Sequence, residues 1–196
     1  MKALGTMCAA CGAEGLRWKE VKKYRYAESG LDDVWLIGGV RQATCGACRE
    51  VLTHIEAEWQ LLQVIAIILL RKQGLLTGPE TRFLRKAANL SQDALAVLLG
   101  LRGQPTVSER ERRDGPVMSY AEDLGFRMLI LREFVAHLKH PEKNHLVDEH
   151  RAILEHLVQW LYLKTLELKA SRATKKTIEF RRSNSEWTAD TLKEAA

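Results

Sequence analysis

The arrangement of cysteines constrains this chain more than any other feature. All four cysteines fall in two Cys-x-x-Cys pairs, Cys8 with Cys11 and Cys45 with Cys48. Two intervening residues let one tight turn aim both thiolates of a pair at a single ion, and small neighbours let the backbone pass close to it. The two pairs therefore predict one tetrahedral zinc site, which is structural because four thiolates leave no open position for a substrate.

Paired cysteines have other uses. A thioredoxin-like redox motif needs a strand-to-helix context and leaves the second pair unexplained. A catalytic zinc site usually has three protein ligands and an open position. Unrelated free thiols or an iron–sulfur site are the remaining alternatives. Disulfides are disfavoured because the chain shows no export signal, so a reducing compartment is expected.

The composition indicates an ordinary soluble globular protein, with 46% hydrophobic and 28% charged residues. The longest apolar stretch, residues 61–70, is about half the length of a membrane span. We therefore expect a cytoplasmic protein with no membrane partner. The net charge of +5 is compatible with nucleic acid as a partner without requiring it.

The pattern of residues predicts a mainly α chain in which a small β zinc ribbon precedes a helix-turn-helix bundle and long C-terminal helices. The aromatic and β-branched stretches 18–26 and 34–40 predict short antiparallel strands between the cysteine pairs. The predicted regions are a zinc ribbon (1–56), a linking helix (57–77), a helix-turn-helix domain (78–140), a long and dimerising helix (141–170) and a basic tail (171–196).

The middle of the chain predicts several short helices. Ser91 is a good N-cap for a helix over 92–99, and a further helix is expected over 106–113. Two short helices joined by a glycine-containing turn form a helix-turn-helix, whose second helix enters the major groove of DNA. The alternatives are a plain corner of a helical bundle or a helix-turn-helix kept only for dimerisation. For the tail we favour an arm that orders on binding, over a purely solubilising segment.

Residues 76–86 and 90–96 closely resemble Xre-type helix-turn-helix proteins. Together with the double Cys-x-x-Cys ribbon before them, they make residues 7–135 similar to the MqsA-type antitoxin family. The resemblance implies a homodimer that represses its own promoter at a palindromic operator, while the ribbon binds a cognate toxin. In this chain we expect the aromatic residues of the ribbon to contact that partner: Trp18, Tyr24, Tyr26 and Trp35.

The predicted recognition helix departs from the family pattern. Where family members have arginine and tryptophan, this chain has Glu109 and Arg110. A carboxylate at the first position would accept from cytosine instead of donating to guanine, so the operator sequence does not carry over. The remaining residues form a polar, basic helix, or alternatively a solvated face of mixed charge. The predicted DNA contacts are Ser91, Gln92, Gln104, Thr106, Ser108, Glu109, Arg110, Arg112 and Arg113.

We expect no enzyme activity, since the sequence contains no phosphate loop, nucleophile elbow or catalytic constellation of residues. The predicted function is a zinc-containing transcriptional regulator of the antitoxin type. The alternative is a dimeric adaptor protein whose helix-turn-helix no longer binds DNA.

Overall fold

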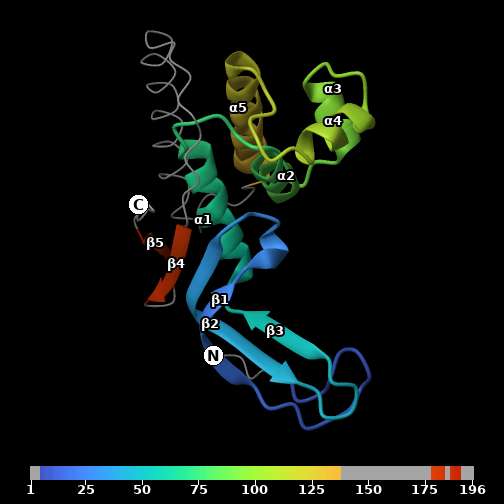
Figure 1. Cartoon of the computed structure of the whole chain (residues 1–196), viewed down its shortest axis with the longest axis vertical. Coiled ribbons are helices and arrows are strands. Elements are labelled where there is room, and N and C mark those ends of the chain that lie inside the picture. Colours follow the sequence, from blue (N-terminus) through green and yellow to red (C-terminus); the bar gives the residue numbers. More distant parts are fainter. Residues whose placement is uncertain (1–4, 138–177, 184–185, 191–196) are drawn as a thin grey trace. The chain divides into compact units, whose positions relative to one another are not determined.

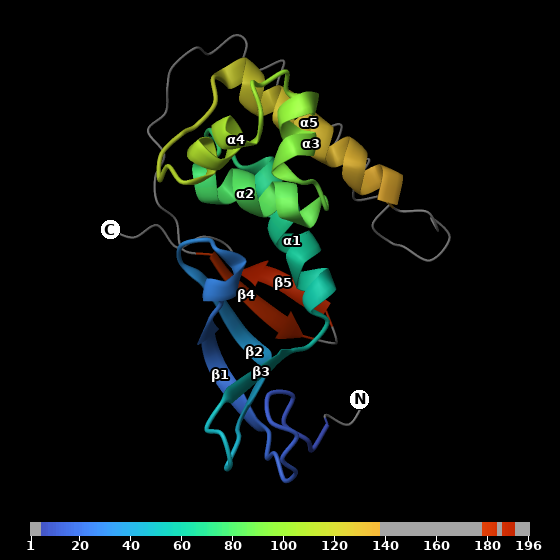
Figure 2. The same cartoon turned by 90° about the vertical axis from the view of Figure 1, so that its right-hand side faces the viewer.

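The computed structural model describes residues 5–137, 178–183 and 186–190, in two compact units. The first unit contains residues 1–61 and 176–196, and the second contains residues 62–175. Figures 1 and 2 show the elements of both units from two directions. The predicted dimerisation helix, residues 141–170, lies outside the described residues.

The first unit is built on a mixed five-stranded sheet whose central strand is β2. One edge of β2 pairs with β1 in antiparallel fashion. The other edge is shared: β4 pairs in parallel with residues 34–37 of β2, and β3 pairs in antiparallel fashion with residues 40–44. The elements of this unit are β1 (Lys19–Arg25), the short 3-10 helix η1 (Ala27–Ser29), β2 (Val34–Thr44), β3 (Val51–Ile55), β4 (Ile178–Ser183) and β5 (Glu186–Asp190).

Strand β2 changes partner at Gly38 and Gly39, whose φ angles are +74° and +68°. Side chains rarely tolerate this conformation, whereas glycine adopts it freely. A Cβ on Gly39 would also lie 2.5 Å from the Cδ of Arg182. At this point the amide of Glu56 donates to the Gly39 carbonyl (2.9 Å), and the indole of Trp187 donates to the Glu56 carbonyl (2.8 Å). The glycine pair therefore lets β3 and the β4–β5 hairpin meet on one edge of β2.

The core of the first unit lies on one face of this sheet. Leu36 of β2 is paired with Phe180 of β4, and both side chains are fully buried. Side chains point alternately to the two faces of a strand, so Val34 joins them on the same face. Tyr26, Val40, Leu61 and Trp187 are also buried.

The prediction of a mainly α chain with a small ribbon at its start is wrong. The described residues contain five helices and a mixed sheet of five strands, to which the C-terminal tail contributes β4 and β5. Figure 1 shows these two strands in red beside β2. The sequence interpretation missed them because Ile178, Phe180 and Trp187 look isolated in a polar tail. Phe180 and Trp187 are buried because they contact Leu36 and Glu56, more than one hundred positions earlier.

The helices of the chain follow β3. They are α1 (Glu58–Arg71), α2 (Gly78–Ala87), α3 (Gln92–Leu98), α4 (Gln104–Glu111) and α5 (Tyr120–His137). Helix α2 begins with a capping box in which Thr77 and Glu80 exchange side-chain and backbone hydrogen bonds. No helix among the described residues is long and apolar enough to cross a membrane.

Arg127, which forms a buried ion pair within α5, also joins α5 to the end of α1. Arg127 donates to Asp123 (2.7 Å), and both side chains are at most 1% exposed. Arg127 also donates to the carbonyls of Leu70 (3.0 Å) and Lys72 (2.7 Å). These carbonyls lie at the end of α1, where a helix lacks backbone partners and its dipole favours a cation. Arg127 therefore caps α1.

Candidate metal centre and nucleic-acid interface

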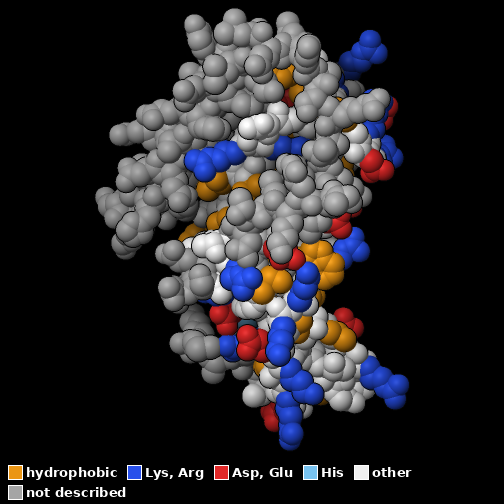
Figure 3. Space-filling view, turned by 60° about the vertical axis from the view of Figure 1, so that its left-hand side comes forward, with side chains coloured by type: hydrophobic (Ala, Val, Ile, Leu, Met, Phe, Trp, Pro, Cys, Tyr) orange, Lys and Arg blue, Asp and Glu red, His pale blue; other side chains and the backbone are white. Residues whose placement is uncertain are grey.

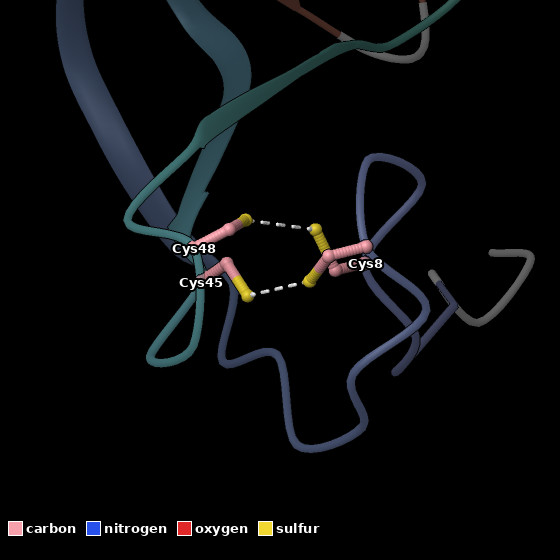
Figure 4. A group of neighbouring side chains, drawn as sticks. Cys8, Cys45 and Cys48 are labelled. Atoms are coloured by element: carbon pink, nitrogen blue, oxygen red, sulfur yellow. Dashed lines mark hydrogen bonds between the residues drawn. The ribbon is translucent and has the colours of Figure 1, made fainter.

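The four cysteines come together at one end of the first unit. Their four sulfur atoms all lie within 4.8 Å of one another. The Sγ atoms of Cys8 and Cys48 are 3.7 Å apart, and those of Cys11 and Cys45 are 3.6 Å apart. Figure 4 shows the sulfurs facing one another across two loops. A disulfide would need a sulfur–sulfur distance of about 2.05 Å. The cluster therefore holds free thiols that could bind one metal ion.

The spacing of the sulfurs fits a tetrahedral ion. Zinc–sulfur bonds of about 2.3 Å place the sulfurs of a tetrahedral site about 3.8 Å apart. The two short Sγ–Sγ distances, 3.6 and 3.7 Å, lie close to that value. Four thiolates also form a donor set that soft or borderline metals prefer, such as Zn²⁺ or iron. The geometry therefore supports a closed four-thiolate metal centre.

Each cysteine pair lies in its own turn, and the two turns have the same pattern of backbone hydrogen bonds. In the first, the Cys8 carbonyl accepts from the amide of Gly12 and the Cys8 amide donates to Ala13 (both 2.8 Å). In the second, Cys45 makes the equivalent bonds with Arg49 (3.0 Å) and Glu50 (2.9 Å). The residue four positions after the first cysteine has a positive φ in both turns.

The second turn also stabilises the thiolate of Cys45, whereas the neighbouring cysteines raise the pKa of Cys48 to about 12. Hydrogen bonds from the backbone amides of Cys48 and Ala47 lower the pKa of Cys45 to about 6. Amides that donate to sulfur favour its charged form, which is the form that binds metal. Only a small core surrounds the cluster: Leu16 and Ala43 are buried, with Trp18 and Leu52 packed against them. Metal binding would therefore supply much of the folding energy of this region.

The four aromatic residues expected to contact a partner have different environments. Tyr26 is only 3% exposed, and its hydroxyl donates to Glu58 (2.7 Å). Burial raises the pKa of Tyr26, and the hydrogen bond to Glu58 and the charge of that carboxylate raise it further. Tyr26 is thus a core residue rather than an exposed one. The other three are partly buried: the indole of Trp18 donates to the Gly5 carbonyl, Tyr24 donates to Glu28, and Trp35 lies under the ammonium of Lys23.

Helices α2, α3 and α4 are tied together by one polar network. Arg85 of α2 donates to both carboxylate oxygens of Glu111 in α4 (2.5 and 2.9 Å), and both side chains are buried. Gln92 of α3 donates to the same carboxylate (2.7 Å) and accepts from Gln104 (2.8 Å). Ser91 caps α3 by accepting from the amide of Ala94 (3.0 Å), which confirms the expected N-cap. The network sets the orientation of α4 against the other two helices.

Most of the predicted DNA contacts lie on α4 or directly after it. Val107 and Glu111 form the buried side of this helix. Four of the predicted contacts are exposed, namely Gln104, Glu109, Arg112 and Arg113, and Thr106 and Ser108 are partly exposed. Arg110 is also partly buried, and its guanidinium donates to Glu122 of α5 (3.1 Å). Hydrogen bonds from the Ser119 backbone and hydroxyl, and then from Arg110, lower the pKa of Glu122.

Arg110 therefore packs between α4 and α5. This is the position where the family pattern has tryptophan, and the arginine contacts the rest of the unit instead of facing outward. Glu109 is exposed and pairs with Arg113 one turn later. In the lower part of the face in Figure 3, Lys and Arg side chains follow one another down the surface, with a few Asp and Glu side chains beside them.

Sequence reasoning did not single out two strongly exposed apolar residues. Val97 of α3 is 79% exposed, and Trp59 of α1 is 61% exposed. The helical pattern of α3 places Val97 away from Leu95 and Ala96, which are buried. An apolar residue outside the buried stripe of a helix was the signal that could have identified them.

Comparison with known proteins gives no relative for this chain: no family model, curated protein or solved structure matches it.

Proposed function

We propose that this chain is a zinc-containing, DNA-binding transcriptional regulator of the MqsA antitoxin type. Cys8, Cys11, Cys45 and Cys48 bind one structural Zn²⁺. Residues 78–115 bind DNA through α4. The protein acts as a homodimer on a palindromic operator in its own promoter, and the zinc ribbon binds a cognate toxin. It has no catalytic role.

One observation carries this proposal. The buried Arg85–Glu111 pair, extended by Gln92 and Gln104, holds α4 across α2 and α3 with its polar side outward. A helix-turn-helix presents its second helix to the major groove in this way. Ser91 and Gln92 begin α3, and helix N-termini favour contact with phosphates. The four-cysteine cluster in the same chain supports the combination of ribbon and helix-turn-helix.

The test is a titration of the full-length, zinc-loaded protein against the DNA upstream of its own gene. Scrambled DNA serves as the competitor at about physiological salt, where specific binders reach about 10⁻⁸ M or tighter. The double variant Arg112→Ala, Arg113→Ala should bind this DNA at least tenfold more weakly, and its affinity should depend less on salt. Lys22→Ala with Arg25→Ala, which removes two exposed charges from β1, is the matched control. Equal affinity for scrambled DNA contradicts the proposal.

The second candidate is an adaptor that binds proteins and not DNA. The exposure of Val97 and Leu98 favours it, because exposed apolar patches often mark protein interfaces. Dependence on salt separates the two candidates. Binding to phosphates weakens steeply as salt rises, whereas an apolar contact with a protein does not.

A further inference from the structure

The carboxylate of Glu109 lies at the outermost position of α4. Val107 and Glu111 are the buried residues of this helix, at 2% and 4% exposure. Successive residues turn by about 100° around a helix axis, so Glu109, two residues from each, lies on the opposite side. Its side chain is 62% exposed. A ligand that approaches the outer face of α4 therefore meets this carboxylate.

Neighbouring arginines make a carboxylate acceptable next to DNA. Arg113 donates to Glu109 from one turn later, and Arg112 is exposed beside it. Both cations reduce the repulsion between Glu109 and phosphates. The Glu109–Arg113 pair is solvent-exposed at both ends, and such pairs contribute little to stability. Glu109 can thus exchange Arg113 for another donor at little cost.

Arg110 does not compete for the same contact, because its guanidinium donates to Glu122. Glu109 is consequently the residue that meets a base at the centre of the outer face. A carboxylate only accepts hydrogen bonds. The donors that bases present in the major groove are the amino groups of cytosine and adenine.

Of these two bases, cytosine suits a carboxylate better. In the major groove the adenine amino group lies between two acceptors, its own N7 and the O4 of thymine, which repel a further acceptor. The cytosine N4 amino group has an acceptor, the O6 of guanine, on one side only. We infer that Glu109 determines operator specificity by selecting a C·G base pair through the cytosine N4 amino group. This inference rests on the proposed function and adds to it the base that α4 reads.

The experiment selects bound sequences from a pool of randomised duplex DNA. It uses the full-length, zinc-loaded wild type and two variants, Glu109→Gln and Asp114→Asn. Asp114 is exposed and lies just after α4, so D114N removes the same charge without changing the outer face of the helix. Dissociation constants are then measured for the selected site and for the site with the C·G pair changed to T·A.

The wild type should enrich one C·G pair and lose about 5- to 150-fold in affinity when that pair is changed. E109Q should lose this preference and favour A·T, since glutamine pairs with both N6 and N7 of adenine. D114N should bind all sequences more tightly and keep the preference for C·G.

Two outcomes overturn the inference in distinguishable ways. If E109Q and wild type enrich the same sequences, DNA binding stands but Glu109 does not determine specificity. If the wild type enriches no sequence at physiological salt, the proposed function fails as well.

Discussion

At the scale of single residues, the backbone conformation limits which residue type fits at several positions of the chain. Gly12 and Arg49 hold equivalent places in the two metal-binding turns, with φ of +76° and +62°. Glycine adopts this conformation without strain, and arginine does so at a cost of about 1 kcal/mol. Gly78 is restricted for a different reason, which is the close approach of two chain segments.

Replacing Gly78 with alanine should destabilise the protein by about 1–3 kcal/mol. The new Cβ would lie 2.4 Å from the carbonyl oxygen of Arg113 and 2.5 Å from that of Arg110. Both atoms belong to the backbone, so α2 and the end of α4 must separate. Urea denaturation followed by circular dichroism gives the free energy of unfolding.

Gly125→Ala is the matched control. Gly125 lies within α5, and a Cβ there meets no atom within 4 Å. Alanine favours a helix over glycine by about 1 kcal/mol, so this variant should gain stability. Equal effects of the two substitutions would contradict the close packing at Gly78.

At the scale of elements, local signals set where helices begin, and a buried ion pair sets how they pack. Thr77 and Ser91 cap α2 and α3 with bonds that span three residues. Arg85 and Glu111, in contrast, are 26 positions apart and connect α2 with α4. The exposed pair Glu109–Arg113 on the same helix offers an internal comparison.

Arg85→Met should cost about 3–5 kcal/mol, because it leaves the buried Glu111 carboxylate without its cation. Adding Glu111→Leu to this variant should restore most of the loss, since removing both charges also removes their desolvation cost. Arg113→Met should change stability by less than about 1 kcal/mol. Thermal unfolding of the three variants tests this prediction, which fails if Arg85→Met and Arg113→Met behave alike.

At the scale of the whole molecule, the C-terminal hairpin completes the N-terminal sheet. Phe180→Ala should destabilise the first unit by about 3–5 kcal/mol, because Phe180 is fully buried against β2. Arg181→Ala, at the next and exposed position of β4, should have little effect. Tryptophan fluorescence, to which the buried Trp187 contributes, follows the unfolding of the two variants. A Phe180→Ala variant as stable as Arg181→Ala would contradict the position of β4.

Removal of the proposed metal ion tests a second long-range link, the one between the two cysteine pairs. A strong zinc chelator should unfold the region around the cysteines, since few buried side chains surround them. Elemental analysis should find one zinc per chain, and Cys45→Ser should lower this content. Ala10→Ser, an exposed change in the first turn that keeps all four thiols, should retain the metal. A ribbon that stays folded after complete metal removal would contradict a structural role.

Features that depend on short spacings follow from the sequence alone. Two Cys-x-x-Cys pairs identified the four cysteines that gather in one cluster. Cap residues and apolar periodicity located the short helices α3 and α4 to within two residues. Hydrogen bonds three or four residues apart are encoded where they form, and so they can be read locally.

The pairing of distant segments, in contrast, follows only from how the elements pack together. This packing placed β4 and β5 on β2, so that Arg182 and Trp187 reach Glu56 across more than 120 positions. It also buried Tyr26, which the sequence suggested as a surface residue, and directed Arg110 to Glu122. These outcomes depend on burial and charge pairing between elements. No local pattern contains them, because the partner of each residue lies elsewhere in the chain.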